Sequence, residues 1–284
     1  MIAGYWRHPI LWRQPRLLRF FSQFLLAVTF GLIALPAISG EVVDLKTRDT
    51  SIRLLLEGPD QPTIVIALFM GGDGNVQITD QGTVDKGKGN FAIRTRAQFH
   101  GRGIATVVVA APSDMGAGLT RLRGSKEYAT DFGNVIAYLR ERFKSPVWVH
   151  GTSRGTISIT LPVPKITEAL SRPDGIILSS AVTVSDRRSK NAADNVLDAD
   201  LERIVGPVLV IANSKDACHV TPASGAQRIA QALKQAKPVV VKIFDGPDDS
   251  AEGDPCGPTH HHGYPGIRKE VIDFMIEFMT QPRS

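Results

Sequence analysis

The chain of 284 residues is long enough to bury one full hydrophobic core. Its 43% hydrophobic and 21% charged residues are typical of a globular protein and exclude a disordered one. The net charge of +5 raises the question of nucleic-acid binding, but residues 1–39 hold four arginines and no acidic residue. The rest of the chain therefore carries about +1, and no nucleic-acid partner is indicated.

Residues 1–39 have the layout of a secretory signal peptide. Arginines are followed by the apolar residues 20–35, a proline and small residues, with Ala37 and Ser39 at the −3 and −1 positions of a cleavage site. The alternative is an uncleaved anchor, because an apolar run of about 16 residues is borderline for crossing a bilayer. If the segment stays uncleaved, it is the part of the chain through which we expect the protein to contact a membrane. We expect an exported protein, periplasmic or extracellular, in which residues 40–284 form a single domain.

Strand-like and helix-like segments alternate after residue 40. Thr63–Met70 is almost entirely apolar and lies between Pro62 and Gly71, as expected for a strand buried on both faces. A helix is expected to begin after Ser125, a good N-terminal capping residue. Further strands are expected at 51–58, 104–112, 146–150, 175–182, 206–214 and 238–245, and helices at 91–103, 126–143 and 267–279. The alternation predicts an α/β fold, with a doubly wound, mostly parallel sheet and helices on both faces.

The predicted strand at 146–150 runs into the pentapeptide Gly151-Thr152-Ser153-Arg154-Gly155. In open α/β sheets, ligands bind beyond the carboxyl ends of the strands. Glycines two residues away on each side let a strand turn sharply into a helix, while the serine takes a strained conformation that exposes its Oγ. The alternative is a tight turn with no catalytic role. The context of strand, turn and helix favours a nucleophilic Ser153.

A nucleophilic serine needs a base, and the base needs an acid that orients it. Asp216 follows the predicted strand at 206–214, and His260, His261 and His262 lie between the last strand and the last helix. Taken singly, the aspartate is typical of a turn, and the histidines of a solvated loop or a metal ligand. The order Ser, Asp, His at the ends of successive strands favours a catalytic triad instead.

Cys218 and Cys256 are the two cysteines of the chain. In an exported protein a pair of cysteines favours a disulfide. The alternative is a zinc site formed by both cysteines, His219 and a histidine of 260–262. The residue types suit zinc, but their spacing matches none of the usual zinc-ligand patterns. We predict the disulfide and no metal.

From about Val42 to Met279, the chain resembles the α/β-hydrolase fold family in its strand order, its pentapeptide around the serine and its triad order. It looks most like small secreted serine hydrolases, similar to esterases and dienelactone hydrolases, with a minimal lid. The resemblance implies Ser153 as nucleophile, Asp216 as acid and His262, in the sequence His-Gly-Tyr, as base. His261 is the alternate base.

The resemblance also implies an oxyanion hole formed by two backbone N–H groups, those of Arg154 and Gly72. The sequence has Met70-Gly71 where the family commonly has His-Gly, which puts the second donor in question. A disulfide between Cys218 and Cys256 would tie the loop of the acid to the loop of the base.

The function expected from these residues is hydrolysis of a small-molecule carboxylic ester, or a related acyl bond, through an acyl-enzyme and without a cofactor. A serine peptidase or amidase is the nearest alternative, because it uses the same triad. A binding protein without catalysis on a hydrolase scaffold is the alternative from another class, since a fold does not determine a function. A metal-dependent enzyme using the histidines is a third.

Overall fold

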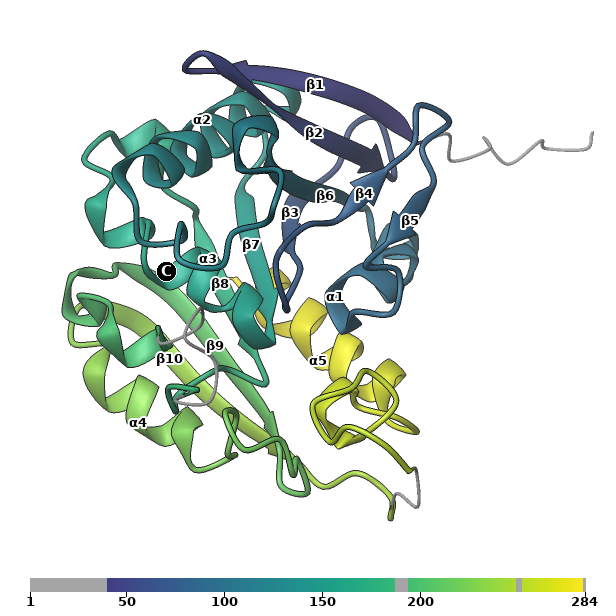
Figure 1. Ribbon diagram of the computed structural model, residues 1–284, viewed down its shortest axis with the longest axis vertical. Helices are drawn as coiled ribbons and strands as arrows, with labels where there is room; N and C mark the ends of the chain where they lie inside the picture. The colour runs from purple at the N-terminus through teal and green to yellow at the C-terminus, as the bar shows by residue number, and fades with distance from the viewer. Residues whose placement is uncertain (1–39, 187–193, 249–251, 283–284) are drawn as a thin grey trace, which may run out of the picture. The chain divides into compact units, whose positions relative to one another are not determined.

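The computed structural model describes residues 40–186, 194–248 and 252–282 (Figure 1). The signal peptide predicted for residues 1–39 lies outside the described residues. In the described part of the chain, no helix combines the length and the apolarity that a membrane span needs.

An eight-stranded sheet forms the centre of the fold, with the strand order β1-β2-β6-β3-β7-β8-β9-β10. Its strands are β1 (Glu41–Thr47), β2 (Thr50–Glu57), β3 (Ile64–Phe69), β6 (Ile104–Pro112), β7 (Val147–Thr152), β8 (Gly175–Ser179), β9 (Gly206–Asn213) and β10 (Ala236–Phe244). The hairpin of β1 and β2 joins β6 antiparallel, and all other neighbours in this sheet are parallel. The prediction of a mostly parallel sheet is confirmed.

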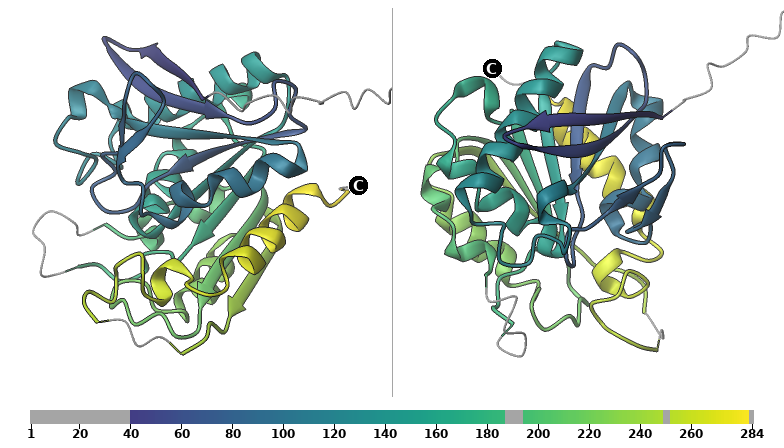
Figure 2. Two further views of the ribbon diagram at one scale, coloured as in Figure 1. Left: turned by 90° about the vertical axis from the view of Figure 1, so that its right-hand side faces the viewer. Right: turned by 45° about the horizontal axis from the view of Figure 1, so that its top comes forward.

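Helices cover both faces of the sheet (Figure 2). The α-helices are α1 (Phe91–Arg94), α2 (Lys126–Phe143), α3 (Ile157–Thr160), α4 (Gly225–Ala232) and α5 (Arg268–Thr280). Alternate residues of β3 serve the two sides: Val65 belongs to the hydrophobic cluster with α2 and α4, and Ile66 to the cluster with α1 and α5. All six residues of β3 are buried, which explains the continuous apolar run of this strand.

Short 3₁₀ helices fill many of the connections. They are η1 (Arg96–Arg102), η2 (Ser113–Met115), η3 (Ser153–Gly155), η4 (Val163–Lys165), η5 (Ala169–Ser171), η6 (Val196–Asp198), η7 (Leu201–Arg203) and η8 (His261–Gly263). The glycine-rich segment of residues 71–90, after β3, holds a small hairpin of β4 (Gln77–Ile78) and β5 (Val84–Lys86).

The helix expected at 91–103 is divided into α1 and η1 at Thr95. The Thr95 hydroxyl donates to the carbonyl oxygen of Phe91 at 2.7 Å, a local bond that is known to bend helices. The helix expected from Ser125 is present: the Ser125 side chain accepts from the N–H of Tyr128 at 3.0 Å, as a helix cap does.

Candidate active site

Ser153 stands at the turn from β7 into η3, with a φ of 57°. This left-handed conformation is strained for a serine, and such strain is concentrated at functional sites. Steric crowding explains why the residues two positions before and after Ser153 are glycines. A Cβ on Gly151 would collide with the carbonyl oxygen of Gly155, and a Cβ on Gly155 would collide with that of Phe69. The turn therefore has the geometry of a nucleophile elbow.

Asp216 and His262 meet at the carboxyl ends of β9 and β10. His262 Nδ1 lies 3.0 Å from Asp216 Oδ2, and the two side chains are 5% and 1% exposed. The other carboxylate oxygen, Oδ1, accepts from the N–H of Cys218 at 3.0 Å. A buried carboxylate with both oxygens engaged is fixed in place, and it fixes the ring of His262.

The neighbouring His261 points elsewhere. Its Nε2 lies 2.6 Å from the carbonyl oxygen of Pro247. Of the two histidines considered as the base, the structure therefore brings His262 to Asp216 and places His261 in a loop contact.

Ser153 and His262 line one cavity of about 290 Å³. Its other lining residues are Met70, Gly71, Gly72, Gly87, Gly89, Asn90, Phe91, Thr152, Cys256, Pro258 and Gly263. No lysine, arginine, aspartate or glutamate is among them. A larger hollow of about 710 Å³ beside α2 is lined by none of the predicted catalytic residues.

Gly72, the predicted second oxyanion donor, belongs to a turn at the edge of the cavity. The carbonyl oxygen of Gly71 accepts from the N–H of Gly74 at 3.0 Å. Because the C=O and N–H of a trans peptide point in opposite directions, the N–H of Gly72 faces away from this turn. Gly72 has a φ of +57°, which glycine adopts without strain.

Arg123 was missed by the sequence reasoning. Its guanidinium is buried and donates to the carbonyl oxygen of Gly72 at 2.8 Å and to the hydroxyl of Ser158 at 2.8 Å. Burial lowers the pKa of Arg123 to about 10, so it remains charged at neutral pH. It holds the glycine turn beside the elbow. Nothing in the sequence singles out this arginine, because it lies 51 positions from Gly72.

The side chain of Arg154, whose N–H is the other predicted oxyanion donor, extends to Asp186, with Nη2 3.2 Å from Oδ2. It is 18% exposed. The charged group of Arg154 is thus held by an ion pair, and Arg154 is not among the residues that line the cavity.

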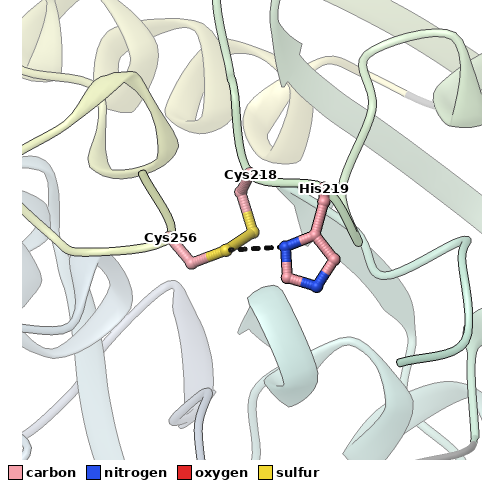
Figure 3. A group of neighbouring side chains, drawn as sticks. All are labelled: Cys218, His219 and Cys256. Atoms are coloured by element: carbon pink, nitrogen blue, oxygen red, sulfur yellow. Dashed lines mark hydrogen bonds between the residues drawn. A yellow bond between two sulfur atoms is a disulfide. The ribbon is translucent and has the colours of Figure 1, made fainter. Parts of the chain in front are cut away.

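The predicted disulfide between Cys218 and Cys256 is present, with the Cα atoms 4.6 Å apart (Figure 3). It joins the loop after Asp216 to the loop before His262. His219 lies beside it, with Nδ1 4.0 Å from the sulfur of Cys256. Sulfur atoms bonded to each other are not thiolate ligands, so this arrangement does not fit the zinc alternative.

The loop of His262 is held by two further groups that the sequence reasoning did not single out. Arg94 of α1 donates to the carbonyl oxygen of Pro258 at 2.7 Å and to that of Gly263. The hydroxyl of Ser180 lies 3.0 Å from the carbonyl oxygen of His262. These bonds fix the backbone on both sides of the imidazole.

By sequence, no protein-family model and no curated protein matches the chain. Solved structures do match it. A Pyrococcus horikoshii acylaminoacyl peptidase has a TM-score of 0.59 and 15% identity, covering 88% of this chain and 43% of the peptidase. The chain thus spans less than half the length of that protein.

A cold-adapted esterase from an Arctic intertidal metagenomic library has a TM-score of 0.54 and 13% identity, covering 84% of this chain and 92% of the esterase. TT1662 from Thermus thermophilus has a TM-score of 0.56 and 14% identity, covering 86% and 99%. Together with the sheet order, these similarities show that the chain has the α/β-hydrolase fold, as the sequence predicted.

Proposed function

We propose that this protein is a serine hydrolase that cleaves a carboxylic ester, with Ser153 as nucleophile, His262 as general base and Asp216 as the acid that orients it. One observation carries the proposal: a serine in a strained elbow lines the same cavity as a histidine bonded to a buried carboxylate. The three residues follow β7, β9 and β10 in the chain, which supports this assignment because the carboxyl ends of parallel strands lie at one edge of the sheet.

In this proposal the Oγ of Ser153 attacks the ester carbonyl while Nε2 of His262 takes its proton. The N–H groups of Gly72 and Arg154 stabilise the negative charge on the carbonyl oxygen. Collapse of the tetrahedral intermediate breaks the ester bond, and His262 returns the proton to the leaving alcohol. A water molecule then hydrolyses the acyl-enzyme by the same steps. The carboxylate of Asp216 stabilises the imidazolium.

The substrate we propose is an ester whose acyl group is small and carries no charge. Among the described residues, no Lys, Arg, Asp or Glu side chain lines the cavity, so this lining offers no ion-pair partner to a charged acyl group. Its volume of about 290 Å³ is at the lower end of the range for ligand pockets. Met70, Phe91 and Pro258 give it apolar walls.

The test is turnover of p-nitrophenyl acetate and butyrate, together with labelling by a fluorophosphonate probe. We expect Ser153→Ala to abolish both, and His262→Ala to lower turnover by at least about 10³-fold. His261→Ala is the matched control and should leave turnover within about threefold of the wild type. Equal turnover by wild type and Ser153→Ala, with no labelling of the wild type, would favour a binding protein on this scaffold.

A peptidase is the second candidate, supported by the similarity to an acylaminoacyl peptidase. Cleavage of an N-acetylamino-acid p-nitroanilide in preference to the esters, dependent on Ser153, would select this alternative.

We further propose that the protein is exported. The disulfide between Cys218 and Cys256 supports this location, since such bonds persist in oxidising compartments. Fractionation of producing cells, with sequencing of the mature N-terminus, tests export and cleavage after Ser39 together. Retention in the cytosol with both thiols free would contradict it.

A further inference from the structure

We propose that the side-chain amide of Asn90 is a third donor to the oxyanion, beside the N–H groups of Gly72 and Arg154. This inference rests on the proposed function. Asn90 lines the cavity of Ser153 and His262, at the end of the glycine-rich segment where α1 begins.

The orientation of the Asn90 amide is set by its surroundings. Oδ1 accepts from the N–H of Ala92 at 3.2 Å, which caps α1. This bond decides which end of the amide is oxygen, because an N–H group needs an acceptor opposite it. The backbone of Asn90 is held as well. Its N–H donates to the carbonyl oxygen of Gly87 at 3.0 Å, and its carbonyl oxygen accepts from the backbone N–H of Arg94 at 2.9 Å.

The nitrogen end of the amide lies beside the elbow. A methyl group placed on Gly71 would lie 3.3 Å from Asn90 Nδ2 and 3.0 Å from the Cβ of Ser153. Nδ2 of Asn90 and the Cβ of Ser153 therefore lie at most 6.3 Å apart. Gly71 precedes the proposed donor Gly72, so the amide nitrogen approaches the side of the elbow where the oxyanion would form.

Within the described residues, Nδ2 of Asn90 donates to no protein acceptor. Besides Ser153, His262 and Asn90, the described lining of the cavity holds one further side-chain donor, the hydroxyl of Thr152, which is 2.7 Å from that of Ser179. Asn90 thus supplies the cavity with a donor that is oriented and not engaged elsewhere. A preorganised donor of this kind is worth about 10² to 10³ in kcat when it meets the oxyanion.

The test compares Asn90→Ser with the wild type. Serine keeps a capping oxygen for α1 but removes the amide nitrogen, so the stability of the fold should hardly change. We expect kcat for p-nitrophenyl acetate to fall about 10²-fold while KM changes less than threefold, because the lost bond is made to the transition state. Asn90→Asp also keeps the cap, and its carboxylate should lower kcat at least as far.

Asn75→Ser is the matched control. This asparagine belongs to the same segment, but its Nδ2 donates to the carbonyl oxygen of Gly116 at 3.0 Å and it does not line the cavity. Its kcat should stay within about twofold of the wild type, and thermal unfolding of all variants should match.

Two results would overturn the inference: Asn90→Ser with kcat within threefold of the wild type, or a rise in KM at unchanged kcat, which would assign Asn90 to substrate binding. If Asn90→Ser is less stable, Asn90→Asp decides by the same criteria. Failure of the proposed function looks different, since the wild type itself would then lack Ser153-dependent turnover.

Discussion

The hydroxyl of Thr221 lies 2.9 Å from Oδ2 of Asp216, the same oxygen that meets His262 Nδ1. It also lies 3.1 Å from Nδ1 itself. A hydroxyl that donates to the carboxylate keeps a lone pair for the N–H of the imidazole. The proton on Nδ1 thus faces two oxygens, and Asp216 does not position His262 alone.

Replacing Thr221 by valine tests this relationship. Valine has nearly the same shape but no hydroxyl, so Oδ2 of Asp216 loses a buried donor. We expect kcat/KM for p-nitrophenyl butyrate to fall about tenfold, equivalent to about 1.4 kcal/mol of transition-state stabilisation. Thr221→Ser restores the hydroxyl and should recover most of the activity. Equal rates for Thr221→Val and wild type would show that the hydroxyl has no part in catalysis.

Removing the disulfide should affect both stability and turnover. The bond closes a loop with a sequence separation of 38, for which the chain-entropy relation gives about 4 kcal/mol of stabilisation. We expect the double variant Cys218→Ser/Cys256→Ser to unfold at lower denaturant and to have a lower kcat, because the loops of acid and base are no longer joined.

The wild type treated with a dithiol supplies the control for that experiment. Its denaturation midpoint should approach that of the double variant, while the double variant itself should not respond. A midpoint unchanged by both treatments would contradict a stabilising role for the bond.

A substitution at Gly89 can change the width of the cavity. Its φ is outside the left-handed region, and a Cβ there would lie 3.4 Å from Cγ of Pro258, another lining residue, in ordinary van der Waals contact. Gly89→Val should therefore fold and narrow the cavity. We expect turnover of p-nitrophenyl acetate to stay within threefold, and that of the hexanoate to fall at least tenfold. A uniform change over the series of acyl lengths would place the acyl chain elsewhere.

Because His150 of β7 is buried, we expect the free energy of unfolding to fall at acid pH. Burial lowers the pKa of this imidazole from 6.5 to about 3. Between these two values the unfolded chain binds a proton that the folded chain excludes, so stability falls as the pH drops through this window. The contribution is up to about 1.4 kcal/mol per pH unit. In His150→Gln, the free energy of unfolding measured from pH 7 to 4 should depend less steeply on pH; an identical slope would contradict the assignment.

The sequence was sufficient for features that depend on local pattern. Apolar runs indicate buried strands, and the strand expected at 104–112 matches β6. The cap at Ser125 and the disulfide were also predictable, from one residue type at a helix start and from a single cysteine pair. Thr95 divided a predicted helix because its side chain competes for a backbone carbonyl, which apolar periodicity does not register.

The supporting residues of the site were not predictable, because their partners are distant in the sequence. Arg94 donates to Gly263 across 169 positions, and Asn90 and Ser153 line one cavity only once β3 and β7 have paired. Thr221 is closer to Asp216, but a threonine five residues after an aspartate has no distinctive pattern. Contacts of this kind follow from the completed fold.

The contact of Gly155 with the carbonyl oxygen of Phe69 has a consequence for protein engineering. Phe69 is the last residue of β3, and the turn that carries the proposed oxyanion donor starts two residues later, at Gly71, so the elbow and this turn are anchored at one junction. Swapping either loop with that of another protein of this fold would disturb both. Selectivity can instead be altered at Gly89, which lines the cavity and whose added Cβ would contact only Pro258.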